Sequence, residues 1–326
     1  MKKIFITGGG GYVGSALTDY LILKGYMVTV YDLFMYGKDV FESKKNLKII
    51  EGDLRDTALL ESSIKGHDAV VHLACISNDP SFELNPNLGK SINLDAFEPL
   101  VKISKNNGVK RFIYASSSSV YGIKKEQNVH EEMQLEPITD YSRFKMECEK
   151  ILNKHKSDTF ITTTVRPATV CGYSRRQRLD VIVNILSNIG FHKREITIFG
   201  GDQLRPNIHI KDMLRIYEVI LEADAGKING EIFNAGWENK SVKDIALTVK
   251  KILGDDIKLV VTPTDDNRSY HISSEKIKKV LNFSTKFTID DAVSDMEEAF
   301  KKNKLEDPLN NPNYFNIKKM HEINLT

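Results

Sequence analysis

Thr7-Gly8-Gly9-Gly10-Gly11-Tyr12-Val13-Gly14 is the stretch that decides how the N-terminal part of the chain folds. The apolar run 3–7 before it has strand character, and the apolar residues after it recur at helical spacing, at Val13, Ala16, Leu17, Tyr20 and Leu21. Glycines between a strand and a helix allow a tight turn and let backbone amides approach a pyrophosphate at the helix N-terminus. The stretch therefore predicts a dinucleotide-binding turn.

The alternation of strands and helices continues along the chain. Short runs rich in β-branched residues predict strands at Lys3–Thr7, Met27–Asp32, Leu47–Glu51, Ala69–Leu73, Arg111–Ala115 and Ile161–Arg166. Segments of helical period separate these runs, which is typical of βαβ units and a parallel sheet. The fold class that we expect is α/β, with a doubly wound parallel sheet of the Rossmann type.

This regular alternation fades after about Arg166. The segment 172–205 is basic and less periodic, and the tail from Asn303 is polar and weakly patterned. Helical patterns and one more strand pattern stand between and beyond them, at Ser241–Leu253, Ile289–Phe300 and Glu231–Ala235. We expect an NAD-binding Rossmann domain and a smaller, interleaved α/β substrate-binding region, divided as 1–170, with 206–250 partly returning to it, against 171–205 and 251–326.

An acidic residue closes the second predicted strand. Asp32 follows Gly11 by 21 residues, where a carboxylate that binds a ribose 2′-hydroxyl is expected. Its charge would repel a 2′-phosphate, and the next residues, Leu33-Phe34-Met35, offer no arginine to bind one, so the pattern favours NAD over NADP. A second acidic cluster, Gly52-Asp53-Leu54-Arg55-Asp56, follows the third strand and suits either a helix N-cap or a place at the adenine.

Hydroxyl groups mark the end of the fifth predicted strand. Ser116–Ser119 stand there, at the carboxyl edge where ligands bind in this architecture. Further on, Tyr141 and Lys145 are four residues apart in a helical stretch, so the phenol and the ammonium share one face. A phenol needs about 4 kcal/mol of extra phenolate stabilisation to act as a base near neutral pH, and nearby cations such as a lysine and an oxidised nicotinamide supply it. The group therefore favours proton and hydride removal from an alcohol.

Composition excludes several other classes of protein. The 46 Lys and Arg nearly balance 44 Asp and Glu, for a net charge of +2 without a basic stripe, so no nucleic-acid partner is expected. Three widely spaced cysteines, Cys75, Cys148 and Cys171, fit buried free thiols in a reducing cytoplasm, and no metal site is expected. Glycines interrupt the N-terminal apolar run at Gly8 and no run approaches a membrane span, so neither export nor membrane insertion is expected.

Together these motifs resemble the extended short-chain dehydrogenase/reductases that act on nucleotide sugars, over nearly the whole chain. The family patterns TGxxGxxG, GDxxD, the fourth-strand motif and YxxxK match Thr7 to Gly14, Gly52 to Asp56, His72-Leu73-Ala74, and Tyr141 with Lys145. The resemblance implies NAD as the cofactor. It places the cofactor against Gly8, Gly11, Tyr12, Val13, Gly14, Asp32, Asp53, Leu54, Leu73, Ala74, Asn93, Tyr141, Lys145 and Pro167.

The resemblance also implies a catalytic group, Ser117, Tyr141 and Lys145, without a metal. A nucleotide-diphosphate sugar would bind against Ser77, Ser117, Ser118, Tyr141, Thr169, Arg205 and Arg268. The two arginines stand in segments that resemble the diphosphate-contacting segments of the family, although as bare residues they suit surface ion pairs equally well. Members of the family are often dimers, so a homodimer is expected.

The residues after Ser117 distinguish activities within this family. Its 4,6-dehydratases carry Asp-Glu there to remove water, whereas this chain has Ser118 and Ser119. The resemblance favours an NAD-dependent 4-epimerase, of the kind used in polysaccharide biosynthesis, which oxidises the sugar C4 hydroxyl and returns hydride to the opposite face. The alternatives are a C4 dehydrogenase or 4-ketoreductase, and a non-catalytic NAD-binding regulator. Cys171, where Tyr or Phe is usual, and the basic stretch 174–178 leave the base and the sugar open.

Overall fold

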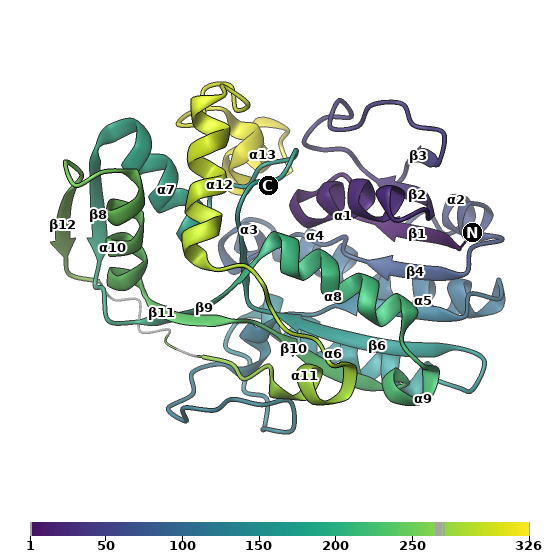
Figure 1. Ribbon diagram of the computed structural model, residues 1–326. Coiled ribbons are helices and arrows are strands. Elements are labelled where there is room, and N and C mark those ends of the chain that lie inside the picture. The colour runs from purple at the N-terminus through teal and green to yellow at the C-terminus, as the bar shows by residue number, and fades with distance from the viewer. Residues whose placement is uncertain (1, 265–268, 270, 326) are drawn as a thin grey trace.

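The computed structural model describes residues 2–264, 269 and 271–325, and a seven-stranded parallel sheet is its centre (Figure 1). The strand order is β10-β6-β5-β4-β1-β2-β3. In chain order these strands are β1 (Lys3–Thr7), β2 (Met27–Asp32), β3 (Leu47–Glu51), β4 (Ala69–His72), β5 (Arg111–Ala115), β6 (Ile161–Pro167) and β10 (Glu231–Ala235). All seven expected strands are present, with β4 one residue shorter and β6 one residue longer than predicted.

Helices cover both faces of this sheet. On one face lie α1 (Tyr12–Leu23) and α8 (Ile210–Glu222), and on the other lie α2 (Thr57–Ile64), α5 (Phe97–Asn106) and α6 (Asp140–His155). Alternate residues of β1 enter the two layers: Ile4 and Ile6 pack in one core and Phe5 in the other. A strand buried on both faces needs a continuous apolar run, which is why the sequence pattern located β1, β4 and β5 so closely.

A second region lies beyond the carboxyl ends of the strands (Figure 1). It holds a three-stranded sheet of β11 (Glu238–Ser241), β9 (Leu204–His209) and β7 (Thr169–Cys171), and a pair, β12 (Lys258–Thr262) and β8 (Glu195–Phe199). A separate core joins α7 (Ile182–Lys193), α10 (Val242–Leu253) and α12 (Ile289–Lys301) to β8. Helices were expected at α10 and α12, whereas periodicity did not predict these five short strands.

The remaining elements are short and connect or flank these layers. They are α3 (Asp79–Glu83), α4 (Pro86–Lys90), the π-helical turn η1 (Ser91–Asp95), η2 (Ser118–Tyr121), α9 (Ala225–Ile228), α11 (Glu275–Leu281), η3 (Pro312–Tyr314) and α13 (Asn316–Glu322). The last of them corrects the expectation of a weakly patterned tail. In Figure 1, α13 returns to the N-terminal unit and lies near the start of α1.

A buried ion pair anchors the end of β5. Arg166 is 2% exposed, and its Nε and Nη2 donate to the two carboxylate oxygens of Glu149 at 3.0 and 2.7 Å. The Ser116 hydroxyl donates to the same carboxylate, and the Tyr121 hydroxyl accepts from Arg166 Nη1. Because a buried charge is stable only when paired, this cluster fixes where the serine stretch leaves the sheet.

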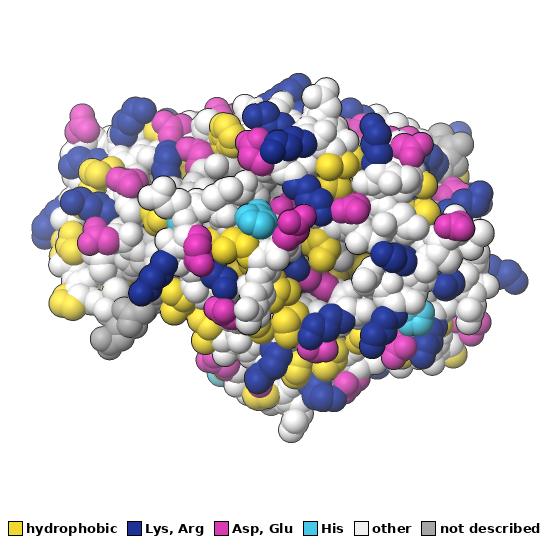
Figure 2. Space-filling model, turned by 90° about the horizontal axis from the view of Figure 1, so that it is seen from below, with side chains coloured by type: hydrophobic (Ala, Val, Ile, Leu, Met, Phe, Trp, Pro, Cys, Tyr) yellow, Lys and Arg dark blue, Asp and Glu magenta, His cyan; other side chains and the backbone are white. Residues whose placement is uncertain are grey.

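The surface carries charges of both signs. On the face seen in Figure 2, Lys and Arg side chains are interspersed with Asp and Glu rather than gathered. Within the described residues, no helix is long and apolar enough to cross a membrane. Cys148 and Cys171 are buried free thiols as expected, and burial raises the pKa of Cys148 to about 12, but Cys75 is only partly buried and lines a cavity.

We predict that Gly14→Ala disrupts the glycine turn. A Cβ at position 14 would stand 2.1 Å from the carbonyl oxygen of Gly8, so the turn must move. Crowding of this kind should lower the free energy of unfolding by about 1–3 kcal/mol, measured by denaturant unfolding. Gly226→Ala is the control, since its Cβ would meet only the flexible Asp224 carboxylate, at 3.1 Å. Equal stability of the two variants would contradict the close packing of this turn.

Candidate active site

Two adjoining cavities lie at the carboxyl edge of the main sheet. One, of about 230 Å³, follows the glycine turn and the ends of β2 and β3, and the other, of about 440 Å³, lies over the ends of β5 and β6. Their walls share six residues, namely Tyr12, Val13, Leu73, Cys75, Ser77 and Arg178. The two cavities therefore form one continuous site, as expected at the point where the strand order reverses.

The smaller cavity contains most of the residues expected to bind the cofactor. It is lined by Gly8, Gly11, Tyr12, Val13, Gly14, Asp32, Asp53, Leu54, Leu73 and Ala74. Gly11 is the N-cap of α1 and offers no side chain to its first turn, and that turn carries no acidic residue. The free amides and the helix dipole at this end suit a pyrophosphate.

Asp32, the last residue of β2, lines the same cavity. Its two carboxylate oxygens accept hydrogen bonds from Gly10 N at 2.9 Å and Phe34 N at 2.7 Å. Burial raises the pKa of Asp32, while these two backbone donors and the more distant Arg176 guanidinium act against that rise. A carboxylate fixed in this way has lone pairs left for the hydroxyls of a ribose.

The two aspartates of the acidic cluster after β3 have different roles. Asp56 is the N-cap of α2 and accepts a hydrogen bond from Leu59 N at 3.0 Å, which is the helix-capping role considered for this cluster. Asp53 lines the cavity, where its carboxylate pairs with Arg55 at 2.5 Å and its carbonyl accepts from the Tyr31 hydroxyl. The Arg55 guanidinium holds the pKa of Asp53 below its usual value.

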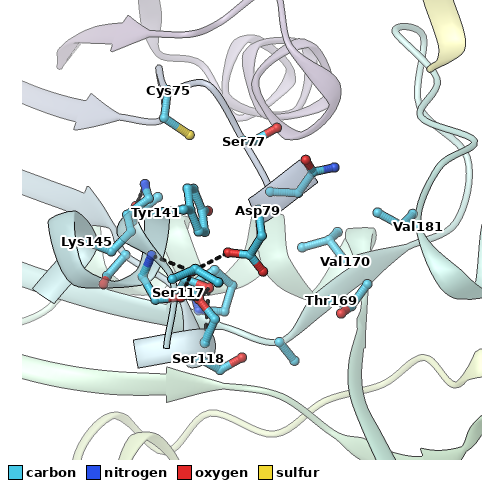
Figure 3. Close-up of a pocket in the computed structure, with 18 of the residues that line it drawn as sticks. Cys75, Ser77, Asp79, Ser117, Ser118, Tyr141, Lys145, Thr169, Val170 and Val181 are labelled. Atoms are coloured by element: carbon cyan, nitrogen blue, oxygen red, sulfur yellow. Dashed lines mark hydrogen bonds between the residues drawn. The ribbon is translucent and has the colours of Figure 1, made fainter. Parts of the chain in front are cut away.

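The larger cavity brings together the expected serine, tyrosine and lysine (Figure 3). Tyr141 and Lys145 lie one turn apart on α6, and the Lys145 ammonium is 5.7 Å from the centre of the Tyr141 ring. Lys145 is 4% exposed and donates to the carbonyl of Ala115 at 2.7 Å, at the end of β5. The helix therefore holds the ammonium between the sheet and the phenol.

Burial dominates the ionisation of Tyr141. It raises the pKa of the phenol well above its usual value of 10, and the charge of Asp79 acts in the same direction. The Arg178 guanidinium and a hydrogen bond to Ser117 lower the pKa. In this protein Arg178 thus joins Lys145 as a cation of the site, and a further positive charge beside the phenol would be needed to produce a phenolate near neutral pH.

A chain of hydroxyl groups runs from Ser117 to a carboxylate. Ser117 Oγ lies 2.8 Å from Ser119 Oγ, which accepts from Ser142 Oγ at 2.9 Å. Ser142 Oγ lies 2.9 Å from Thr139 Oγ1, and Thr139 donates to Asp79 Oδ1. All five side chains line the larger cavity, and Figure 3 shows Asp79 directed into it. The sequence analysis missed Asp79 and this connection.

The remaining residues expected to bind cofactor or substrate separate into three groups. Ser77, Ser118, Thr169, Pro167 and Arg205 all line the larger cavity. Asn93 lines neither cavity: its amide binds the backbone of Ile76 in both directions, at 2.8 and 2.9 Å, so it supports the cavity wall instead of facing it. Arg268 lies outside the described residues.

Two of the three arginines in the stretch after β7 also line the site. Arg176 lines the smaller cavity, Arg178 lines both, and Arg175 points away to Glu42. The sequence analysis noted this stretch only as a departure from the family. In the part of the chain that the structure describes, no cluster of three or more His, Cys, Asp or Glu is placed to hold a metal ion.

Comparison with known proteins gives consistent matches. The model of the NAD dependent epimerase/dehydratase family matches residues 4–236. A UDP-glucose 4-epimerase of Lactobacillus helveticus is 28% identical over 314 residues, which is 90% of this chain and 95% of the relative. These two findings bear out the resemblance to short-chain dehydrogenase/reductases and the expected enzyme class.

Solved structures agree with this assignment of the fold. A UDP-glucose 4-epimerase from Thermotoga maritima with UDP-glucose superposes with a TM-score of 0.84 at 26% identity, over 92% of this chain and 99% of that one. A dTDP-glucose 4,6-dehydratase from Streptomyces venezuelae with NAD bound shares the fold, with a TM-score of 0.84 at 21% identity over 94% and 100% of the two chains. The Rossmann-type fold and NAD as the cofactor are confirmed, and the glycine turn, the open helix end and Asp32 fit that cofactor.

We predict that NAD binds more tightly than NADP and that Asp32→Ala narrows the difference. The carboxylate accepts hydrogen bonds from the ribose hydroxyls and repels a 2′-phosphate. Its removal should therefore weaken the binding of NAD roughly tenfold or more, the scale of one charge-assisted hydrogen bond. Calorimetric titration with both dinucleotides measures this. Equal affinities of the unmodified protein for the two would contradict the role of Asp32.

Proposed function

The chain belongs to the NAD dependent epimerase/dehydratase family, and on this premise we propose that it is a nucleotide-sugar 4-epimerase. The observation that carries the proposal is the convergence of Ser117, Tyr141 and Lys145 in a cavity continuous with the dinucleotide site. Two further serines, Ser118 and Ser119, occupy the positions where elimination of water would need an acid and a base. The substrate class is a nucleoside diphosphate linked to a hexose.

Tyr141 is the acid and base of the proposed reaction. Its phenolate takes the proton of the sugar C4 hydroxyl and gives it back in the second half-reaction. NAD, when bound, would supply the acceptor and the donor for the C4 hydride. Because burial opposes ionisation of Tyr141, the positive charges of Lys145, Arg178 and the oxidised nicotinamide together favour the phenolate. The Ser117 hydroxyl donates to the reacting oxygen and steadies its charge.

The rest of the cavity holds the substrate in place while the sugar turns. Arg205 reaches it from β9, and in this proposal its guanidinium binds the diphosphate together with Arg268. Ser77 and Thr169 line the same cavity and offer hydroxyls to the sugar. A volume of about 440 Å³ lies within the range of small-molecule sites and leaves space for a 4-keto sugar to present either face.

A one-way oxidoreductase at C4 is the second candidate. Epimerisation returns the proton to the oxygen that lost it, whereas net oxidation must release one. The hydroxyls of Ser117, Ser119, Ser142 and Thr139 lead to Asp79, and once the Ser142 hydroxyl turns its hydrogen from Ser119 to Thr139 they would provide a path for that proton, outward for a dehydrogenase and inward for a ketoreductase. The two candidates therefore differ in whether protons and NADH accumulate.

We predict that Tyr141→Phe keeps the cofactor bound but loses most turnover. Removal of a positioned proton-transfer group should lower kcat on the order of 10²-fold or more, since no other side chain is proposed to take the C4 proton. Initial rates at saturating substrate, with circular dichroism as the folding control, measure the effect. Ser142→Ala is a useful comparison, because it interrupts the hydroxyl chain without touching the phenol. Near-normal turnover of a folded Tyr141→Phe protein would remove Tyr141 from the mechanism.

The proposed reaction is tested by incubating the protein with UDP-, GDP-, dTDP- and CDP-hexoses. Product stereochemistry is read by nuclear magnetic resonance, and reduced cofactor by its absorbance. We expect one nucleotide series to give the C4 epimer without net consumption of NAD. Stoichiometric NADH without an epimer would establish the one-way reaction instead, and a 4-keto-6-deoxy product would establish dehydration.

A further inference from the structure

Arg176 is a buried cation in the wall of the dinucleotide cavity. Its side chain is 4% exposed, and it stacks on the ring of Tyr36 with Cζ 3.4 Å from the ring centre. Its Nη2 donates to Asn316 Oδ1 at 2.8 Å, while its Nε has no hydrogen-bond partner. Within the described residues, no carboxylate lies within 4 Å of its guanidinium.

The neighbouring arginines, unlike Arg176, each pair with a carboxylate. Arg178 pairs with Asp180 at 2.5 Å, and Arg175 pairs with Glu42 at 2.6 Å on the surface. A guanidinium keeps its charge in proteins, and burial without a counterion is costly. Arg176 therefore has the properties of a group whose counterion is a ligand of the cavity that it lines.

The backbone around Arg176 fixes where that ligand charge would be. Ser174 donates to the carbonyl of Tyr12 at 2.7 Å, and Arg176 N donates to Ser15 Oγ at 3.4 Å, so this stretch is bound to the first turn of α1. The side chain extends from there to Tyr36 in the loop after β2, within electrostatic range of Asp32. The guanidinium thus lines the same cavity as the helix end that suits a pyrophosphate, and its charge acts on the carboxylate that suits the adenosine ribose.

Asn316, the first residue of α13, holds this arrangement. It is 2% exposed, and its Oδ1 accepts from both Arg176 and the Tyr36 hydroxyl, each at 2.8 Å. Its Nδ2 donates to Ser77 Oγ at 2.9 Å, and its backbone N donates to Asp180 at 2.8 Å. One residue of the C-terminal tail therefore joins the loops after β2, β4 and β7, and Met320 and Leu325 of the same tail line the cavity.

We propose that Arg176 binds the pyrophosphate of NAD on its adenosine side, and that Asn316 and the C-terminal helix hold the guanidinium there, so that the tail closes the cofactor site. Arg176 and Asn316 both lie outside the strands and turns that form the Rossmann half of the site. Their role is to slow release of the dinucleotide in both redox states. This inference depends on NAD as the cofactor and not on the identity of the sugar or the outcome at C4.

The test measures cofactor binding directly. Release of NADH from the protein is followed by stopped-flow fluorescence with excess NAD as the competitor, and affinities for ADP-ribose and adenosine are measured by calorimetry. Arg176→Ala should speed NADH release and weaken ADP-ribose by about tenfold or more, the loss expected for one charge-assisted contact to phosphate. Adenosine, which has no phosphate, should change less than twofold. Arg175→Ala, from the same stretch but directed to Glu42, should behave as the unmodified protein.

Asn316→Asp keeps the size of the side chain and gives Arg176 a carboxylate partner. If the guanidinium serves the cofactor, this variant should also release NADH faster, by about tenfold; Asn310→Asp, an added charge on the exposed part of the tail, should not. The Asn316→Asp variant therefore tests the proposal even if Arg176→Ala fails to fold. Unchanged ADP-ribose affinity in folded Arg176→Ala, or unchanged release in Asn316→Asp, would overturn the proposal. If Arg176→Ala weakened the binding of NADP but not that of NAD, the proposal would also be overturned, since Arg176 would then bind a 2′-phosphate.

Discussion

The close approach of Gly14 to the carbonyl oxygen of Gly8 is the constraint on which the site depends. A Cβ at position 14 would lie 2.1 Å from that oxygen, so only glycine allows α1 to pack directly on the turn that leaves β1. This packing brings the uncapped end of α1 to the carboxyl edge of the sheet, beside Asp32 from β2. The ends of β5 and β6 then face the same space, and Tyr141 and Lys145 reach it from α6. The glycine turn thus determines where both cavities lie.

The extent of sequence-based prediction follows the physics of burial. The seven strands of the main sheet were predicted within one residue at their ends. For β1, β4 and β5 the reason is that strands covered on both faces need continuous apolar runs. The glycine turn, Asp32, Ser117, Tyr141 and Lys145 line the two cavities as expected, because their spacing along the chain reflects local geometry. By contrast, β7, β8, β9, β11 and β12 are short strands in small two- and three-stranded sheets, so their sequences lack a clear period.

Residues brought to the site by tertiary contacts were harder to predict. Asp79 is the first residue of α3, directly after the N-cap Asn78, and its connection to Ser117 runs through Thr139 and Ser142 of a distant segment. Arg176 and Asn316 are in contact although 140 residues separate them in the sequence. The basic stretch after β7 was visible in the sequence, but not which of its arginines turns inward. Asn93 is the opposite case: it was predicted to contact the cofactor, but its side chain binds the backbone of Ile76 and lines neither cavity.

The C-terminal tail links the two halves of the site, because Asn316 binds Asp180 and Asp180 pairs with Arg178 beside Tyr141. Such an arrangement suits a reaction in which cofactor and sugar stay together until hydride has returned. The most direct measurement of that account uses a nucleotide hexose carrying deuterium at C4 of the sugar, with both epimers analysed by mass spectrometry after many turnovers. The account predicts that the deuterium stays at C4 in substrate and product alike. Loss of the label to free cofactor or to solvent would contradict it.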